Sequence, residues 1–523
     1  MNKIEIELYY REWQEAKERL LKEISMKEPV RRIVSALALP KKYTGSFALI
    51  PANLDLDRHL ERFPVTDYFF VRDESGHIKA VNQNGTLGYY FDKERLVHII
   101  GLISSIPAGN RDLVTDNGYV PINSSVLRNY FKDYFSYLDY LLRTGVLITD
   151  GIAFKGEKSY GYKFSPEYEN QPMIRYIYLA ARDVQPEPIM EERFNRHTGK
   201  FEHNPLLDYP YLSHWYEQMK LGINPAAEDF AWHRRTTAYR GSSNKDPQAQ
   251  YQSALCNIIA LENKEYKAQI DSNVHRLHSA ITNMQKDYRN FLKYDGQELT
   301  AIDISNSQPF LLCILFNPDF WDRDSDAYIN IGHLPENIQN RFSDELLAEI
   351  KTYVESIQED SKSEYIIKAS SGEVYKFMMD KANEQYPGCC KEKKDAKIMM
   401  LIAFFSSNRF LNQKGAHLKK VFSETFPEIY ELIKMSKVND KSDFACLLQS
   451  VESEIILHRC CKRIWDEGEH KVPVFTIHDS IATTAENVKF VRNIMDEELT
   501  KAAGVHPSFK IELWSESNLM TNN

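Results

Sequence analysis

Two aspartates, each at the end of a short apolar segment, constrain the fold of this chain more than any other feature. Asp303 lies in LTAIDISNSQPFLL and Asp479 lies in VPVFTIHDSIATT, and long helical stretches separate the two segments. A third strand-like segment, SFKIELW, follows near the end. A sheet assembled from strands this far apart, with helices inserted between them, predicts an α+β fold.

The residues beside each aspartate indicate how the backbone turns there. After Asp303 a strand gives way to a helix, and Pro309 suits the first turn of that helix because its missing N–H costs nothing there. His478 and Asp479 fall where two short strands would join in a hairpin. Two carboxylates that converge on a sheet edge are typical of a two-Mg²⁺ phosphoryl-transfer site, since hard cations prefer carboxylate oxygens. Either aspartate alone is weak evidence, because Asp is common at strand ends.

A basic helix is predicted between the two aspartates. In KEKKDAKIMMLIAFFSSN, Lys393, Lys397, Leu401 and Phe405 recur every four residues, which places two cations and then two apolar groups along one face. Residues 381–420 contain nine Lys/Arg and three Asp/Glu, in a chain with a net charge of −9. Such a face can hold a triphosphate at one end and a base at the other. The alternative is an ordinary amphipathic helix with a solvated basic end.

The sequence around the first aspartate resembles the family A DNA polymerases. The palm of that family begins with an Arg-Leu-x-Ser-x-x-x-Asn-x-Gln element, ahead of the strand that carries the first catalytic Asp. The segment RLHSAITNMQ is similar without a gap, and its matching residues are Arg276, Leu277, Ser279, Asn283 and Gln285. The first catalytic motif of the family, Asp-x-Ser followed by a helix with Gln or Glu, resembles Asp303, Ser305 and Gln308.

The basic helix resembles the fingers helix of the same family, whose pattern is Arg-x3-Lys-x3-Phe/Tyr-x3-Tyr. Lys393 stands in place of the Arg, which gives a point charge instead of a planar fork. Leu401 stands in place of an aromatic residue, and Ser406 in place of the Gly that follows the last aromatic.

The elements that follow also resemble the family, in the same order. A palm helix with the pattern Gln-x4-Asp is similar to Gln449 and Glu454, and the His-Asp motif is similar to His478 and Asp479. The segments VKFVRNIMDEEL and PSFKIELW resemble the helix and the last strand that close the palm. The resemblance covers about residues 276–516.

This resemblance implies a role for each matching residue. Asp303 and Asp479 are the expected catalytic residues and would hold two Mg²⁺ ions, for which Mn²⁺ can substitute. The expected nucleotide-binding residues are Lys393, Lys397, Phe405 and Gln308. The expected primer–template-binding residues are Arg276, Asn283, Gln285, Gln449 and His478. Three of these have simpler readings, since Gln449 and Asn283 suit helix caps and His478 suits a strand end.

Three positions bear on the choice of sugar. Gln308 occupies the place of the Glu that packs against the sugar in the DNA polymerases. Ser480, after His-Asp, resembles the His-Asp-Ser of single-subunit phage and mitochondrial RNA polymerases. Phe405 lacks the hydroxyl of the Tyr that is typical of RNA polymerases. We expect a preference for dNTPs over NTPs that is weaker than a strict steric gate gives.

A second module is predicted at residues 91–170. FDKERLVHIIGLISSI, a segment capped at Ser124 or Ser125, and DYFSYLDYLLRTGVL read as three helices, and two short strands around a Gly-Glu-Lys turn follow. That order is typical of a winged helix-turn-helix. Five cations favour duplex nucleic-acid binding: Arg128, Lys132, Arg143, Lys155 and Lys158. The alternatives are a protein dock or an internal brace.

The remaining organisation follows from these two modules. We expect a helical or mixed region at residues 1–90, which begins with a surface helix at 3–26, and a helical thumb-like or connecting region at 171–275. The polymerase palm is expected at 276–523, with the fingers inserted at about 320–445.

Composition limits the cellular setting. With 65 basic and 74 acidic residues, a globally basic nucleic-acid coat is excluded, although a local basic groove is not. The seven cysteines lie at or after Cys256 without a disulfide framework, which favours a reducing compartment. The longest apolar run, Ile398–Phe405, is too short for a membrane span, and the charged N-terminal segment does not read as a signal peptide. We therefore expect a cytoplasmic protein that does not bind membranes.

Two other kinds of site are not expected. Asp92-Lys93-Glu94 is the only Asp-x-Glu ahead of the palm-like region, and a proofreading exonuclease needs more acids on strands. His458, Cys460 and Cys461 lack the ligand spacing of a zinc site.

The sequence thus predicts a template-dependent nucleotidyltransferase, a family A-like DNA polymerase without proofreading, whose partners are a DNA primer–template and dNTPs. Such a protein suits the replication of a mobile element. A primer-independent RNA polymerase or primase is the alternative enzyme. The alternative of another class is a DNA-binding initiator or regulator whose palm serves as a scaffold.

Overall fold

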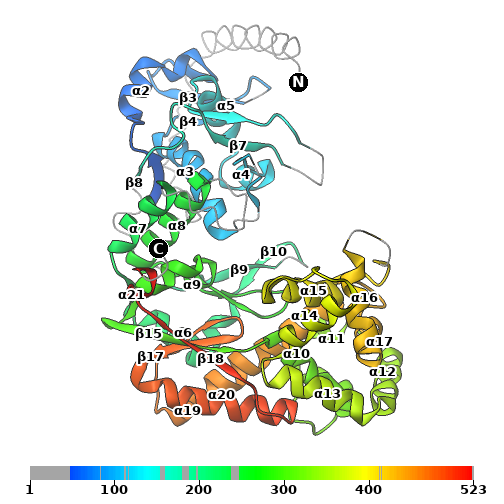
Figure 1. Cartoon of the computed structure of the whole chain (residues 1–523). Helices are drawn as coiled ribbons and strands as arrows, with labels where there is room; N and C mark the ends of the chain where they lie inside the picture. The colour runs from blue at the N-terminus through cyan, green and yellow to red at the C-terminus, as the bar shows by residue number, and fades with distance from the viewer. Residues whose placement is uncertain are drawn as a thin grey trace. The chain divides into compact units, whose positions relative to one another are not determined.

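The computed structural model describes residues 47–520, apart from 83, 111–112, 116, 154–158, 179–187, 196–197, 237–246, 411–412 and 414. The helix expected at 3–26 and the basic turn with Lys155 and Lys158 lie outside the described residues. Helices and strands are mixed along the chain, as an α+β fold requires (Figure 1).

The chain divides into two compact units. The first comprises Met1–Pro186, Pro225–Ala260 and Asn283–Gln285, and the second comprises Glu187–Asn224, Leu261–Thr282 and Lys286–Asn523. The division therefore cuts the stretch 171–275, which the sequence presented as one connecting region.

The first unit contains three small sheets. Strands β1 (Phe47–Pro51) and β8 (Met173–Ile177) pair antiparallel. A three-stranded sheet follows helix α2 (Leu56–Arg62) and consists of β2 (Phe70–Arg72), β3 (Ile78–Val81) and β4 (Leu87–Tyr90). The third sheet has the order β5-β7-β6, from β5 (Val120–Pro121), β7 (Gly161–Phe164) and β6 (Leu147–Thr149). The helices of the unit are α3 (Lys93–Gly109), α4 (Ser124–Tyr130), α5 (Tyr134–Arg143), α7 (Ala226–Thr236) and most of α8 (Pro247–Glu262).

Helix α5 is buried along most of its length. The Ser136 hydroxyl donates to the Val81 carbonyl (2.7 Å), and the Tyr140 hydroxyl donates to the Phe63 carbonyl (2.7 Å). Phe135 and Phe69 pack edge to face, with ring centroids 5.1 Å apart. In a helix-turn-helix the helix at this place in the order enters the major groove. Here the segment around α2 and β2–β4 covers much of the surface that such a helix would use.

The second unit is built around one antiparallel sheet whose neighbouring strands are often far apart in the sequence. Its strands run β11-β14-β15-β17-β16, and β18 also pairs with β15. The bounds are β11 (Leu221–Ile223), β14 (Leu292–Tyr294), β15 (Gln297–Ile304), β16 (Phe475–Ile477), β17 (Ser480–Thr484) and β18 (Phe509–Trp514). Two hairpin-like pairs accompany the sheet: β9 (Glu192–Asn195) with β10 (Lys200–His203), and β12 (Gln269–Ile270) with β13 (Leu277–His278).

The side chains of β15 alternate between the two faces of the sheet, which places core residues on one face and Asp303 on the other. Ile302 is paired with Ile481 across the ladder, and both side chains are fully buried. Helix α20 (Val488–Ala503) packs against β15 and β17. Because successive side chains of a strand point to opposite faces, Asp303 lies on the other face of the sheet from Ile302.

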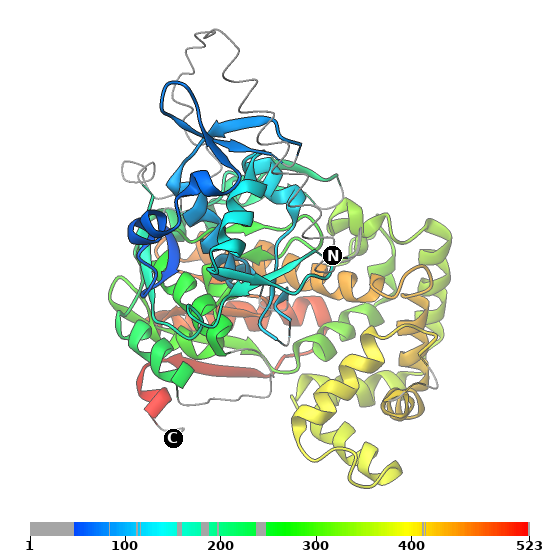
Figure 2. The ribbon, with the colours of Figure 1, turned by 90° about the horizontal axis from the view of Figure 1, so that it is seen from above.

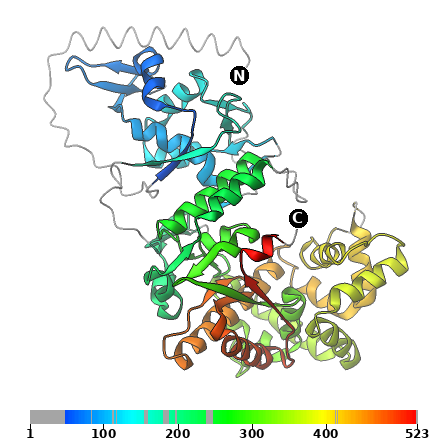
Figure 3. The ribbon, with the colours of Figure 1, turned by 60° about the vertical axis from the view of Figure 1, so that its left-hand side comes forward.

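The helices between β15 and β16 form a large insertion. They are α10 (Ser307–Leu312), α11 (Glu336–Gln339), α12 (Asp344–Ser356), α13 (Glu359–Ser370), α14 (Val374–Gln385), α15 (Lys393–Phe405), α16 (Ala416–Thr425), α17 (Pro427–Met435), α18 (Asp443–Ser453) and α19 (Lys462–Glu467). The yellow helices gather to one side of the sheet, as Figure 2 and Figure 3 both show. The α-helices of the unit outside this insertion and α20 are α6 (Pro210–Glu217), most of α9 (Ala280–Asn283) and α21 (Ser517–Met520).

Two other findings concern the sequence expectations. All seven cysteines are free, and the residues described include all of them. In the part of the chain that the structure describes, no helix has both the length and the apolar character that crossing a bilayer requires.

Candidate active site

The two aspartates lie beside each other on the central sheet. Asp303 is the second-last residue of β15, and it pairs with Ser480, the first residue of β17. Asp479 directly precedes that serine, and its carbonyl accepts a hydrogen bond from the Ile304 N–H (3.4 Å). Strands that are far apart in the sequence thus bring both carboxylates to one end of the β15–β17 ladder.

The turn that carries Asp479 has an unusual backbone. Ile477 and Ser480 pair with each other, so His478 and Asp479 form a two-residue loop between β16 and β17. His478 has a φ of 54°, in the left-handed region that favours glycine. A residue other than glycine in this region is uncommon and is enriched at functional sites.

Each aspartate raises the cost of ionising the other. Burial and the neighbouring Asp479 raise the pKa of Asp303 to about 7. Burial also raises the pKa of Asp479, although a hydrogen bond from Ser307 opposes the rise. Two half-buried carboxylates this close repel each other unless a cation or a proton lies between them. The pair therefore has the electrostatics of a cation site.

The donor set suits magnesium. Mg²⁺ in phosphoryl-transfer sites is held by one or two carboxylates together with water and substrate phosphates. Asp303 and Asp479 provide that pair of carboxylates. Within the described residues, no group of three or more His, Cys, Asp or Glu side chains is arranged to hold a metal ion. A metal here would thus complete its coordination from substrate and solvent.

A basic cluster lies next to Asp303. Lys510 of β18 pairs directly with Asp303 across the ladder. Lys510 and Lys286 both donate to the Glu512 carboxylate at 2.9 Å. Both lysines lower the pKa of Asp303 against the effect of burial. They add positive charge at the edge of the site without forming a direct ion pair with Asp303 in this structure.

A third carboxylate, which sequence reasoning missed, lies close by. Glu452 on α18 has a side chain that is only 2 % exposed. It accepts from the Arg276 guanidinium (2.5 Å) and from the Gln308 side-chain amide (2.9 Å). Burial raises the pKa of Glu452 to about 7, although Arg276 lowers it. Asp479 also contributes to the rise, so Glu452 is close enough to interact with the pair of aspartates.

Glu454, which stands at the Asp position of the resembling Gln-x4-Asp pattern, forms a different contact. Its carboxylate accepts from Arg459 Nε at 3.2 Å instead. The helix changes to a π-helical segment, η9 (Glu454–Cys461), at this residue. Gln449 and Glu452 are three residues apart and share one helix face, whereas the fifth residue after Gln449 does not. That i, i+3 spacing is the signal that could have identified Glu452.

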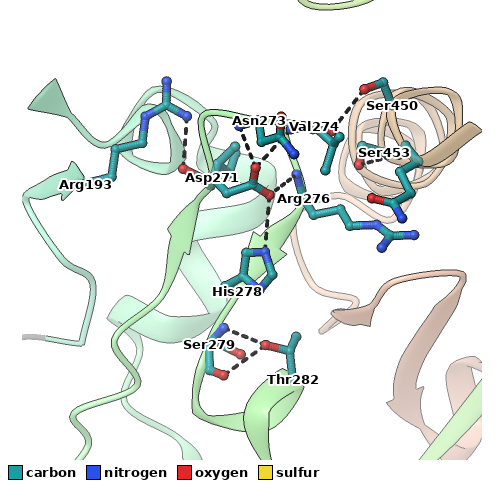
Figure 4. Close-up of polar contacts among 12 residues, drawn as sticks. Arg193, Asp271, Asn273, Val274, Arg276, His278, Ser279, Thr282, Ser450 and Ser453 are labelled. Carbon is teal, nitrogen blue, oxygen red and sulfur yellow. Dashed lines mark hydrogen bonds and ion pairs between the residues drawn. The ribbon is translucent and has the colours of Figure 1, made fainter. Parts of the chain in front are cut away.

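Arg276 extends from a tightly bonded turn (Figure 4). The Asp271 carboxylate accepts from the backbone N–H groups of Asn273 (2.7 Å), Val274 (2.9 Å) and Arg276 (3.0 Å). It also lies 3.2 Å from His278 Nε2. Burial opposes ionisation of Asp271, but the hydrogen bonds from His278 and the backbone lower its pKa to about 2. Asp271 was not predicted, although Asp followed two residues later by Asn is a recognisable turn signal.

The turn also places a second histidine near the loop of His478 and Asp479. The rings of His278 and His478 lie edge to face, with centroids 6.4 Å apart. His278 therefore connects Asp271 with the loop that carries Asp479.

Helix α15, the predicted fingers helix, leaves the two lysines of its predicted binding face exposed to solvent. On α15, Ala396, Met399, Met400, Ala403 and Phe404 are buried. Lys393 and Lys397 are exposed, and Phe405 is half-buried against Phe444, with ring centroids 6.2 Å apart. The charge of Lys397 lowers the pKa of Asp479. The helix thus presents its cations outside the core, and the field of one of them reaches the site.

The C-terminal end of α15 is held by a buried lysine. Lys437 Nζ donates to the carbonyls of Phe404 (2.9 Å) and Ser406 (3.1 Å), and Ala403 O lies at 3.4 Å. These are carbonyls that a helix end leaves without partners. Ser406, where the resembling family has Gly, therefore sits in a well-fixed helix terminus.

The other predicted residues lie in different places. Gln449 is half-buried on α18, one turn before Glu452. Asn283 and Gln285 belong to the first unit, where Gln285 Nε2 donates to the Gln250 carbonyl (3.2 Å). Their position relative to the aspartates stays a prediction. His458 is half-buried and bonds to the Tyr211 hydroxyl (2.8 Å), so its ring serves packing within the second unit.

Comparisons with known proteins leave the family open. No protein-family model matches the chain, and no curated protein matches it. Among solved structures, the chain is similar to the POL domain of Pol1 from M. smegmatis, in a complex with DNA primer-template and dNTP. The identity is 12%, the match covers 56% of each chain, and the TM-score is 0.21. The chain thus spans about half the length of that structure, and a TM-score this low does not establish a common fold.

Proposed function

We propose that this chain is a template-dependent nucleotidyltransferase, a DNA polymerase that resembles family A and uses two Mg²⁺ ions. The observation that carries the proposal is the adjacency of Asp303 and Asp479 on β15 and the β16–β17 loop. The positive charge of Lys397 at the same site supports it, because a triphosphate needs such a partner.

The residues would divide the work as follows. Asp303 and Asp479 would hold the two metal ions, which when bound activate the attacking hydroxyl and neutralise charge on the leaving pyrophosphate. Lys397, assisted by Lys393, would balance the charge of the incoming triphosphate. Phe405 would stack near the nascent base pair, and Gln308 would meet the sugar.

The primer–template would be held by a second group of side chains. These are Arg276, Asn283, Gln285, Gln449 and His478. Arg276 is already fixed by Glu452 and by the Asp271 turn, so it would reach the duplex with little loss of side-chain freedom.

The parts of a right hand can be assigned on the same basis. The sheet of the second unit would be the palm, within residues 276–523, and the helices between about 320 and 445 would be the fingers. Residues 171–275 would supply a thumb-like or connecting region, and 91–170 a winged-helix-like module after the N-terminal region 1–90. We assign no proofreading exonuclease, and we infer a role in replication of a mobile element.

The experiment that tests the proposal is extension of a labelled primer. Wild-type protein with Mg²⁺ is given dNTPs or NTPs, on DNA and on RNA templates, with Asp479→Asn as the control. Template-dependent extension by wild type and its absence in the variant are expected. Extension that prefers NTPs or needs no primer would favour an RNA polymerase or primase instead. Template binding without any synthesis would favour an initiator with a scaffold palm.

A further inference from the structure

Two lysines converge on one carboxylate oxygen beside Asp303. Lys286 begins the 3₁₀ helix η5 (Lys286–Phe291), which packs against β18, and Lys510 lies on β18 itself. Both ammonium groups donate to Oε2 of Glu512, and each nitrogen lies 2.9 Å from that oxygen. Because the two groups share one acceptor atom, they are also close to each other. A single anionic oxygen thus serves two cations.

This cluster lies on the same face of the sheet as Asp303. Lys510 and Asp303 are direct partners across the antiparallel ladder of β15 and β18. Directly paired side chains point to the same face, with Cβ atoms about 5 Å apart. Glu512 is two residues further along β18, so it points to that face as well. Strand β17, which follows Asp479, pairs with the other edge of β15.

The two lysines remain accessible although both are paired. The side chains of Lys286 and Lys510 are each 60 % exposed, whereas that of Glu512 is 28 % exposed. Burial opposes ionisation of Glu512, but hydrogen bonds from the two lysines lower its pKa, so it is an anion at neutral pH. Two cations around one anion leave positive charge in excess. An anion from solvent can therefore reach the lysines and compete with Glu512.

We propose that Lys286 and Lys510 bind a phosphate group of the polymerase substrates, and that Glu512 holds the two ammonium groups together until the phosphate displaces it. The inference rests on the proposed function, in which both substrates carry phosphates and react beside Asp303. A phosphate oxygen is an anionic acceptor like Oε2 of Glu512, so it suits the point on which the ammonium groups converge. The phosphate belongs to the primer–template backbone or to the triphosphate of the nucleotide, and two binding measurements distinguish these sources.

Lys286→Ala with Lys510→Ala tests the site. The first measurement is titration of a labelled primer–template duplex without nucleotide, at several salt concentrations. If the ligand is a backbone phosphate, the affinity should fall roughly tenfold near 0.1 M salt, and the slope of log K against log salt should fall by about 0.9. The second is calorimetric titration of a dNTP with Mg²⁺, without DNA. If the ligand is the triphosphate, the affinity for dNTP should fall about tenfold instead.

Glu512→Gln separates a ligand site from a structural ion pair. The amide keeps the size of the side chain and removes its charge, so the phosphate no longer has an internal competitor. The ligand that the double lysine variant binds more weakly should bind about two- to fivefold more tightly to Glu512→Gln, the range that an exposed ion pair allows. Loss of a merely structural pair would not tighten the binding of any ligand. This variant carries the test if the double lysine variant fails to fold.

Lys462→Ala is the matched control. The Lys462 side chain is 56 % exposed and pairs with Asp466 at 2.6 Å, and both residues lie on α19. That helix packs with α20, which covers the face of the sheet opposite Asp303. Removal of this lysine should leave the affinities for duplex and for dNTP unchanged.

The outcomes distinguish this inference from the proposed function. Unchanged affinity for both ligands in the folded double lysine variant, or binding to Glu512→Gln that is no tighter than to wild type, would overturn the phosphate site while primer extension stands. Absence of extension by the wild-type protein would instead refute the proposed function, and neither binding measurement depends on extension. Circular dichroism and thermal melting of each variant report on folding.

Discussion

Asp303 pairs with Ser480 across the ladder of β15 and β17, and this pairing sets Asp479, the residue before Ser480, beside the first aspartate. The register matters because a slip of one residue would move Asp303 to the face occupied by Ile302 and Ile481. The apolar residues that fill the core under α20 therefore also fix the geometry of the site.

The first prediction concerns these two carboxylates. Asp303→Asn or Asp479→Asn should reduce synthesis on the order of 10³-fold or more, because each removes an anchor for charge that develops in the transition state. Folding and template binding should remain. Primer extension, circular dichroism and a DNA-binding assay check the three expectations.

The matched control is Asp295→Asn. Asp295 lies in the turn before β15, is exposed, and pairs with Lys220 at 3.1 Å. It should extend primers at the wild-type rate. Wild-type extension by either catalytic variant would exclude the two-metal assignment.

The second prediction concerns stability without metal. The pKa of Asp303 is about 7 in the folded protein against 3.8 for the free group, so between these values the folded state retains a proton that the unfolded state has released. Stability of the metal-free protein should therefore fall as the pH rises through this range. In EDTA at pH 8, Asp303→Asn should melt at a higher temperature than wild type.

The difference should disappear near pH 4, where the carboxyl is protonated in the folded protein. Added Mg²⁺ should raise the melting temperature of wild type more than that of Asp303→Asn, because ligand binding to the native state stabilises it. Calorimetry at both pH values, with and without EDTA, measures this. A variant that melts below wild type at pH 8 without metal would contradict the repulsion between the two aspartates.

The third prediction places the triphosphate on α15. Lys397→Ala should lower kcat/KM for nucleotide by about 10- to 100-fold, the usual value of a hydrogen bond to a charged group. Lys394→Ala is the control, since Lys394 is also exposed on α15 but lies outside the row of Lys393 and Lys397. Steady-state kinetics at varied nucleotide concentration measures kcat/KM for each of the two variants. Equal reductions would make α15 a diffuse basic surface rather than a binding site.

Local patterns in the sequence were enough to predict part of this site. The apolar run up to Asp303, Pro309 in the following helix, and a two-residue loop at His478 and Asp479 are short-range features, and the structure has each of them. The buried face of α15 also follows from helical spacing. These elements could be predicted because the residues that decide them are neighbours in the chain.

Glu452 could not be predicted in the same way. Its partners Arg276 and Gln308 come from distant segments, and only packing of α10 against α18 brings them together. The burial of α5 has a similar cause. The residues that cover this helix lie well before it in the sequence, so the periodicity of the helix itself does not reveal them. The resemblance pointed to Glu454 instead, the residue at which the helix becomes π-helical.

The last prediction concerns nucleic-acid binding by the first unit. Because α5 is largely covered, we choose two exposed cations outside it, Arg128 on α4 and Lys132 after that helix. If they bind phosphates, Arg128→Ala with Lys132→Ala should weaken duplex binding. The slope of log K against log salt should fall by about 0.9 for each phosphate that is no longer neutralised. Titration of a labelled duplex at several salt concentrations measures both quantities.

Arg143→Ala is the control for this double variant. The Arg143 guanidinium lies 5.2 Å from the Tyr68 ring centroid, so its removal should lower the melting temperature and leave the salt slope unchanged. Extension of a short, pre-annealed primer should survive in both variants, because Asp303 and Asp479, the proposed metal ligands, belong to the other unit. If the folded double variant keeps the wild-type affinity for duplex and the wild-type salt slope, these two cations do not contact DNA. That result would favour a protein dock or internal brace, with the polymerase proposal left intact.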